Sequence, residues 1–348
     1  MPETVTRVKL SAAIMTHPAR LDRARALRDR HPEHRFRIVV DPHPEQGPSA
    51  LRTARLAWAA ADPCATHHMV VQDDAVLGDP DSIEAAVRQR PTDALSLFTE
   101  WGSATSFAVR LAALAGVPWA ETVDHYTPTV AAVLPAAVAR GFAEYPATVP
   151  QDDVALRTYL LREGVSGYVP VPGLADHDPG VSLTGNDVMG ARRAACHLPG
   201  AAGPDGRTAF SPAVLPFFSW VEGRALCNVR EDPAGAAWRR ELPAWYFAHR
   251  GLDAAEVAER GKAAVRPHAG GPVAPILLYG LWVTACQFGV ELARIGVTPD
   301  PAAPAAREAL RTLPWGVLRR FAPDADLRAA EPAVRDLLLD GLRYGGAP

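Results

Sequence analysis

The chain has 348 residues, a formal net charge of −3 at pH 7, 48% hydrophobic residues and 22% charged residues. This balance allows a buried core and excludes global disorder, and the length suits one large domain or two packed ones. A slightly acidic chain has no cationic field to hold a polyanion, so we expect no nucleic-acid partner.

The first half of the chain alternates short β-like runs with helical patterns. This alternation predicts an α/β fold, with a mainly parallel, Rossmann-like sheet flanked by helices. In chain order, the predicted elements are a strand at 8–15, a helix at 21–30, a strand at 35–40, a helix at 49–61, a strand at 67–72, a helix at 82–89, and strands at 94–98 and 129–134, followed by a helix at 152–162 and a strand at 167–171.

The second half of the chain has a different sequence pattern, with a segment rich in Gly and Pro followed by mostly helical segments. Residues 191–210 are dense in Gly and Pro and are predicted to form a linker between a domain at 1–190 and a mostly helical region at 211–348. The predicted helices of that region are 238–249, 254–265, 274–295, 305–313 and 329–344.

One of these helices, at 274–295, is apolar enough to raise the question of a membrane span. Its polar residues Gln287, Glu291 and Arg294 favour a buried helix, so we expect no membrane span. The start of the chain shows no secretory signal pattern, and the four cysteines form no CxxC pair. Free thiols in a reducing compartment are expected, which predicts a cytoplasmic protein.

The most informative segment is an apolar strand that runs directly into Asp73 and Asp74. In an open α/β sheet, ligands bind beyond the carboxyl ends of the strands. Two carboxylates at such an end could hold Mg²⁺ or Mn²⁺, which would bridge to a diphosphate. The alternative is that the pair only caps a turn.

Further polar groups are expected at the same edge of the sheet. Asp41 closes the second predicted strand, where an acid can hold a ribose or a base. The loop that carries Thr16, His17 and Arg20 follows the first strand. An ordinary strand-to-helix turn with a solvated arginine is the alternative for that loop.

Two later segments add chemistry. His177, between two acids, could complete a metal site, because imidazole is a common ligand of transition metals such as Mn²⁺. Asp152 and Asp153 begin a predicted helix, where one carboxylate could cap the helix and the other could act as a general base. Spacing does not decide which of the two acids is the base.

The order of these elements resembles the GT-A glycosyltransferases, in particular the inverting enzymes related to the large family-two group, over about residues 8–186. The resemblance implies a nucleotide-sugar-binding catalytic domain with a divalent cation, Mn²⁺ or Mg²⁺, as cofactor. It assigns donor binding to Thr16, His17, Arg20, Asp41 and Asp73, the metal to Asp74 and His177, and the base to Asp153 or Asp152.

The chain also departs from that family. Gln72 stands at the first position of the metal motif, the Gln/Arg-x-x-Arg-Trp segment of many processive relatives is absent from the sequence, and no bundle of membrane helices follows. We therefore expect a non-processive enzyme. It would move one sugar from a nucleoside-diphosphate sugar to the hydroxyl of a small molecule or a cell-surface precursor, with inversion. The C-terminal region could contact the acceptor, form a homo-oligomer or serve as a separate module.

Two other functions stay open. A non-catalytic nucleotide- or sugar-binding protein could retain the fold, which Gln72 favours; a nucleotidyltransferase is disfavoured because no Gly-rich, lysine-bearing loop follows the first strand.

The sequence has no Walker-A loop, no Gly-x-Gly-x-x-Gly fingerprint, no His-Glu-x-x-His motif and no Gly-x-Ser-x-Gly elbow. These absences argue against the kinases, dinucleotide oxidoreductases, zinc proteases and serine hydrolases that depend on such motifs.

Overall fold

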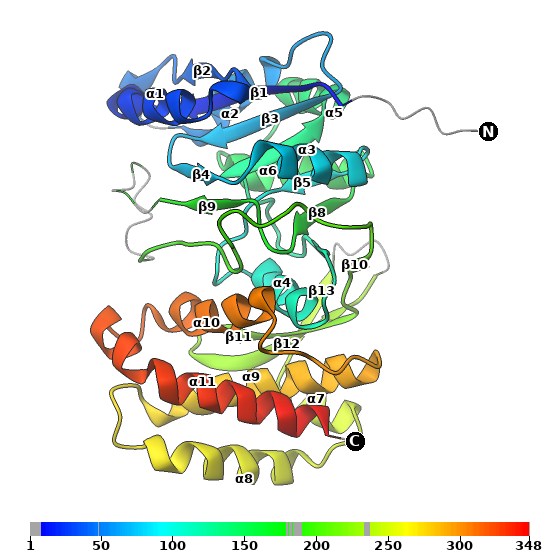
Figure 1. Cartoon of the computed structure of the whole chain (residues 1–348), viewed down its shortest axis with the longest axis vertical. Coiled ribbons are helices and arrows are strands. Elements are labelled where there is room, and N and C mark those ends of the chain that lie inside the picture. The colour runs from blue at the N-terminus through cyan, green and yellow to red at the C-terminus, as the bar shows by residue number, and fades with distance from the viewer. Residues whose placement is uncertain are drawn as a thin grey trace, which may run out of the picture. The chain divides into compact units, whose positions relative to one another are not determined.

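The computed structural model describes residues 8–47, 49–178, 180, 183, 190–232 and 237–347 (Figure 1). The chain divides into two compact units that interleave along the sequence. The first comprises Met1–Thr99, Asp124–Asn186 and His197–Thr208, and the second comprises Glu100–Val123, Asp187–Cys196 and Ala209–Pro348. Residues 184–189, just before the expected end of the first domain at residue 190, lie outside the described residues, as do residues 1–7 and Pro48 in the turn after the second strand.

The first unit contains a mixed, mostly parallel sheet with the strand order β8-β5-β7-β3-β1-β2. Both β2 and β3 pair in parallel with β1, and β8 pairs in parallel with β5, whereas β7 runs antiparallel to β3 and β5. The expected α/β class with a mainly parallel sheet is therefore confirmed. The strands are β1 (Leu10–Thr16), β2 (Arg37–Val40), β3 (His67–Gln72), β5 (Ala94–Ser96), β7 (Ala131–Pro135) and β8 (Gly167–Pro170).

Helices cover this sheet and supply its core. Trp58, Phe142 and Leu156, from three different helices, are almost fully buried in one cluster with Val70 of β3. Burial of each such side chain contributes about 1.5–3 kcal/mol. The helices of the unit are α1 (Leu21–Arg30), α2 (Ala50–Ala59), α3 (Pro80–Gln89), α5 (Ala136–Glu144) and α6 (Asp152–Arg162).

A short ribbon of two strands lies beyond the end of β3. Strand β4 (Ala75–Leu77) pairs antiparallel with β9 (Ala175–His177), so that Ala75 faces His177. The chains approach closely after β4, because the Gly78 amide donates a 2.8 Å hydrogen bond to the Leu174 carbonyl, and a Cβ at Gly78 would lie 2.9 Å from that oxygen. The sequence did not predict this ribbon, since three-residue strands carry too little periodicity to be detected.

The second unit is rich in helices, as expected, but it also contains an antiparallel sheet of order β11-β12-β13, which the sequence analysis missed. A parallel pair of short strands, β6 (Trp119–Glu121) and β10 (Ala209–Phe210), also belongs to this unit. The remaining elements are α4 (Ala104–Leu114), β11 (Val214–Ser219), β12 (Arg224–Arg230), β13 (Trp238–Glu241), α7 (Pro243–His249), α8 (Ala254–Val265), α9 (Pro275–Arg294), α10 (Pro304–Leu318) and α11 (Asp324–Gly346).

The helix expected at 238–249 is wrong in its first part. Residues Trp238–Glu241 form β13, and helix α7 begins only at Pro243. Strand β13 pairs with β12 in the register Arg230↔Trp238, and the Arg230 guanidinium lies 4.7 Å from the Trp238 ring centroid. Pairing with a distant strand thus overrides the local helical preference.

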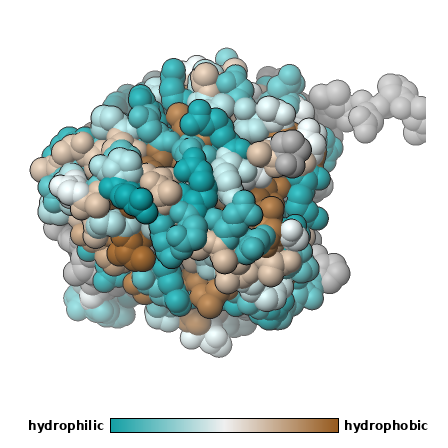
Figure 2. All heavy atoms as spheres, turned by 90° about the horizontal axis from the view of Figure 1, so that it is seen from below, coloured by the Kyte–Doolittle hydropathy of each residue, from teal (hydrophilic) through white to brown (hydrophobic). Residues whose placement is uncertain are grey.

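Helix α9 forms the centre of the second unit. It is the one helix among the described residues that is long and apolar enough to cross a membrane; its most apolar window has a mean hydropathy of 1.5, and 83% of that window is buried. It packs along α11. The face over α8 carries hydrophilic residues with separate hydrophobic patches (Figure 2). The prediction that this segment forms a buried core helix is therefore confirmed.

Candidate functional site

Three strands bring polar residues to one edge of the sheet. Because β1 and β2 are parallel and Thr16 faces Val40, Asp41 follows directly beside Thr16, and its amide donates to the Thr16 carbonyl at 2.9 Å. Because β1 and β3 are parallel and Met15 faces Gln72, Asp73 follows on the other side. The Thr16 hydroxyl donates a hydrogen bond to Asp73 Oδ2. The carboxyl ends of β1, β2 and β3 therefore meet as the sequence predicted.

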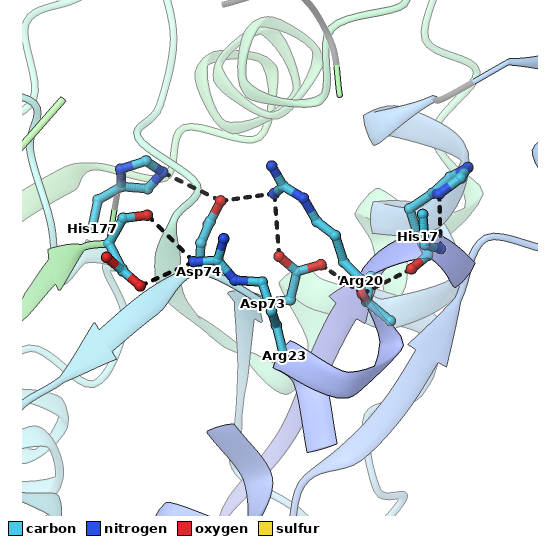
Figure 3. A network of polar contacts seen from close by, with 9 residues as sticks. His17, Arg20, Arg23, Asp73, Asp74 and His177 are labelled. Atoms are coloured by element: carbon cyan, nitrogen blue, oxygen red, sulfur yellow. Dashed lines mark hydrogen bonds and ion pairs between the residues drawn. The ribbon is translucent and has the colours of Figure 1, made fainter. Parts of the chain in front are cut away.

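Arg20 lies between the two acids. Its Nη1 is 3.3 Å from Asp73 Oδ1 and 3.0 Å from Asp74 Oδ2, and both acids are more than nine-tenths buried (Figure 3). A short 3₁₀ turn, Pro18–Arg20, presents this arginine, and His17 Nδ1 accepts the Ala19 amide at 3.2 Å to cap that turn. His17 thus supports the loop, whereas Arg20 contacts the acids directly.

His177 reaches the same place through the β4–β9 ribbon. Its Nε2 lies 3.4 Å from Asp74 Oδ2, and the side chain is buried. The Asp178 amide donates to the Asp74 carbonyl at 2.8 Å, which holds the two chain segments together. Figure 3 shows the histidine on one side of Asp74 and Arg20 on the other. The structure therefore brings His177 to Asp74, as the predicted metal site requires.

The pKa values of the two neighbouring acids, Asp73 and Asp74, are shifted in opposite directions. Burial raises the pKa of Asp73, because it outweighs the hydrogen bond from Thr16 and the charge of Arg20. Burial also pushes the pKa of Asp74 upward, but the hydrogen bond from His177 and the charges of His177, Arg20 and Arg23 outweigh it, so that this pKa lies below its usual value. The surroundings therefore favour the ionised form more strongly at Asp74 than at Asp73.

Asp74 also has an unused ligand atom. Its Oδ1 is buried and has no hydrogen-bond partner within the part of the chain that the structure describes. A buried carboxylate oxygen beside an imidazole is a donor set that fits a divalent cation such as Mn²⁺, which takes both oxygen and imidazole ligands. Gln72, at the first position of the expected metal motif, instead donates from Nε2 to Thr129 Oγ1 at 3.4 Å. Any cation here would therefore depend on Asp74 and His177.

Asp41 lies at the predicted edge but has a partner that the sequence analysis missed. Arg52 of α2 makes two hydrogen bonds of 2.7 Å to the two carboxylate oxygens of Asp41. These bonds are the main reason that the pKa of Asp41 lies below its usual range. Both oxygens are thus occupied, so a ribose at this position would have to share Asp41 with Arg52.

The acids at the start of α6 have different surroundings. Asp153 Oδ1 accepts the Val154 amide at 2.8 Å, and the Asp153 carbonyl accepts the Thr127 amide at 3.0 Å. Asp152 is buried, its Oδ2 has no hydrogen-bond partner among the described residues, and burial together with the charge of Asp153 raises its pKa to about 6. Of the two, Asp152 has the free oxygen and the pKa of a general base.

A hydrogen-bonded path joins Asp152 to the end of β3. Thr129 bonds to the Asp152 carboxylate, and the same threonine accepts from Gln72, the last residue of β3. Since β7 runs antiparallel to β3, its beginning lies at the edge where β3 ends. Asp152 is therefore linked through two side chains to the strand end that carries Asp73 and Asp74.

Arg23 is a second residue that the sequence analysis missed. It follows Arg20 by three positions, about one helical turn, and its Nη2 lies 3.1 Å from Asp178 Oδ2. It adds positive charge on the side of the acids where Arg20 lies, as its influence on the pKa of Asp74 shows. The spacing of two arginines at the start of a helix after the first strand was the available signal.

The second unit has a concavity of its own between α10 and α11, with a volume of about 1080 Å³. Leu310, Leu338 and Leu342 line it together with Arg307 and Arg335. None of the site residues predicted from the sequence lies there, so the predicted chemistry is confined to the first unit.

No protein-family model matches this chain, and no curated protein is significantly similar to it in sequence.

Proposed function

We propose that the chain is a nucleotide-sugar glycosyltransferase of the GT-A type that depends on a divalent cation. The observation that carries the proposal is the buried group of Asp73, Asp74, Arg20 and His177 at the carboxyl edge of the sheet, in which Asp74 Oδ1 has no partner among the described residues. Acids, an imidazole and a guanidinium at such an edge suit a ligand that carries a diphosphate.

In this proposal the residues bind the cation, bind the phosphates or hold other side chains in place. Asp74 and His177 would hold the cation, which when bound neutralises the charge that develops on the departing nucleoside diphosphate. Arg20 and Arg23 supply further positive charge for the phosphates, since guanidinium binds phosphate oxygens in a bidentate manner. Thr16 holds Asp73 in place.

Asp152 completes the reaction. The acceptor hydroxyl oxygen forms a bond to the anomeric carbon while the bond from that carbon to the diphosphate oxygen breaks. The hydroxyl proton passes to the Asp152 carboxylate, and the electron pair of the broken bond leaves with the nucleoside diphosphate. Attack from the face opposite the leaving group inverts the anomeric carbon. A carboxylate with a pKa of about 6 can accept this proton near neutral pH.

One observation favours a second candidate, a nucleotide- or sugar-binding protein without catalysis. Arg20 already gives both acids a cation from within the chain, and Gln72 contacts Thr129 rather than an acid. A site neutralised in this way needs a metal less than two unpaired carboxylates would. The two candidates differ in turnover and in metal dependence.

The deciding experiment is a thermal-shift panel with UDP, GDP, CDP, ADP and dTDP, each with and without Mn²⁺. For a transferase we expect one diphosphate to stabilise the protein mainly when Mn²⁺ is present, by about 2.7 kcal/mol at a ligand concentration of 100 times Kd. Asp74→Asn should abolish this stabilisation. Asp22→Asn, at a side chain that is 96% exposed on α1, is the matched control and should keep it.

The sugar nucleotides of the selected base then separate the candidates. Release of nucleoside diphosphate by the wild-type protein, lost in Asp152→Asn, supports the transferase. Binding without any release supports the second candidate. Failure of every diphosphate to bind, with or without Mn²⁺, overturns the transferase and the nucleotide-binding form of the second candidate.

A further inference from the structure

A second group of metal-binding side chains lies at the C-terminal end of α1. His31 follows the last residue of that helix, and Glu33 and His34 belong to the 3₁₀ turn Pro32–His34 that comes next. His31 Nδ1 lies 3.2 Å from Glu33 Oε1, and His34 Nε2 lies 4.0 Å from the same oxygen. One ligand atom from each residue lies within 4.8 Å of the other two.

His34 gives an independent reason to expect a ligand. Its side chain is only 6% exposed, and its Nε2 is buried without a hydrogen-bond partner among the described residues. Leaving a buried polar atom unsatisfied costs about 1–3 kcal/mol. The ring packs against Phe36, with the centroids 5.2 Å apart, so it is held in place rather than free to turn toward water.

We propose that His31, Glu33 and His34 bind a divalent transition-metal ion, and that Zn²⁺ is the ion that fits best. Two imidazole nitrogens and one carboxylate oxygen form a His₂Glu set, which leaves a fourth tetrahedral position for water. Bond lengths of about 2.0–2.2 Å place neighbouring ligand atoms of a tetrahedral zinc roughly 3.3 Å apart. The separations of 3.2 and 4.0 Å from Glu33 Oε1 are close to this value. The three ligand atoms, which lie within 4.8 Å of one another, would draw together around the ion, and the Glu33 side chain is 40% exposed and has space to move.

The position of this cluster suggests what the ion would do. His31 is the C-cap of α1, and a cation there interacts favourably with the negative end of the helix dipole. The chain then turns through Arg35, which has φ = 50°, into β2. A metal would therefore fasten the end of α1 to the turn that leads into the sheet.

The proposed zinc site is separate from the group of Asp73, Asp74, Arg20 and His177 at the carboxyl edge of the sheet. Helix α1 has 10 residues and is thus about 15 Å long, and Arg20 and Arg23 lie at its other end. The inference does not depend on the proposed transferase function. If the inference holds, the ion fixes the far end of α1, the helix that carries Arg23 and begins directly after Arg20.

Zinc titration of the metal-depleted full chain against a chromophoric chelator tests the proposal. We expect one Zn²⁺ per chain to bind tightly, and His31→Ala and Glu33→Gln each to weaken that binding at least about 10-fold, the lower limit seen for loss of supporting groups around metals. X-ray absorption of the zinc-loaded chain should show imidazole nitrogens at about 2.0–2.1 Å.

Two control variants give the test its specificity. His43→Ala removes a histidine whose Nδ1 lies 3.3 Å from Glu45 Oε1 in an exposed pair. Asp74→Asn removes the carboxylate that would hold the cation at the carboxyl edge of the sheet. Both variants should still bind one Zn²⁺ per chain as tightly as the wild type does. Loss of that tightly bound Zn²⁺ in Asp74→Asn with retention in His31→Ala would overturn the proposal, as would equal affinities of the wild-type chain and Glu33→Gln. Circular dichroism of each variant without metal checks that its fold is intact.

Discussion

His177 Nε2 lies 3.4 Å from Asp74 Oδ2, and this contact joins the ends of two short strands that are far apart in the sequence. It is the main reason that Asp74 keeps a low pKa in spite of its burial. The same contact turns an acid at a strand end into one member of a mixed oxygen and nitrogen donor set.

Replacement of His177 by alanine should weaken Mn²⁺-dependent binding of the nucleoside diphosphate by about 10-fold or more, because a metal ligand and the partner of Asp74 are lost together. Titration of Mn²⁺ at saturating nucleotide, followed by thermal shift, measures the effect. His125→Ala, at an exposed histidine that packs on Tyr126, is the control and should bind as the wild type does. Equal Mn²⁺ affinity of His177→Ala and wild type would exclude His177 as a ligand.

Arg20→Ala should separate metal binding from phosphate binding. Without the guanidinium, the repulsion between Asp73 and Asp74 is no longer offset, so Mn²⁺ should bind more tightly in the absence of nucleotide. The nucleoside diphosphate should bind about 10-fold more weakly, because a charge-assisted contact is lost. Isothermal titration with each ligand measures both changes.

The control for that prediction is Arg25→Ala, at an arginine that pairs with Asp22 on the exposed side of α1. It should leave both affinities unchanged. If Arg20→Ala also leaves Mn²⁺ and nucleotide binding unchanged, Arg20 contributes to neither.

Asp152→Asn should abolish turnover and yet stabilise the fold. The pKa of Asp152 rises from 3.8 to about 6 on folding, so the folded chain binds this proton more tightly than the unfolded chain. Wild-type stability therefore falls as the pH rises from about 4 to about 6. The variant lacks this loss, and above that range it should be more stable than the wild type by at most about 3 kcal/mol. Urea unfolding at several pH values measures the difference.

The same group sets a pH dependence of activity. A base must be ionised, so wild-type turnover should rise through pH 6 and then level off. Asp153→Asn should keep a rise but move it to lower pH, because the negative charge of Asp153 helps to raise the pKa of Asp152. The Asp153 carboxylate itself accepts the Val154 amide at the start of α6. Full turnover of Asp152→Asn would remove Asp152 from the mechanism.

Gly341→Ala should destabilise the packing of α11 on α9. A Cβ at this position would lie 2.5 Å from the Trp282 carbonyl oxygen, so the helices must move apart, at a cost of about 1–3 kcal/mol. Gly270→Ala, where a Cβ would meet no atom within 4 Å, is the control and should stay close to the wild type. Thermal unfolding compares the two, and equal melting temperatures would contradict the close contact.

Local sequence patterns predicted much of the first unit. Strand β3 and helix α1 have the predicted bounds, because a continuous apolar run and a helical pattern are each readable within about ten residues. Once β1, β2 and β3 are parallel, Thr16, Asp41 and Asp73 must emerge at one edge. The sequence by itself therefore determined which acids gather there.

Only the tertiary structure decided how those side chains pair. The ribbon of β4 and β9 brings His177 next to Asp74. Arg52 forms an ion pair with Asp41. Burial of Asp152 at the start of α6 raises its pKa and so makes it chemically different from Asp153. In the second unit, pairing with β12 makes a strand of residues that otherwise favour a helix. Each of these outcomes depends on a contact between distant segments, and the energy of such a contact exceeds the local preferences that a sequence pattern records.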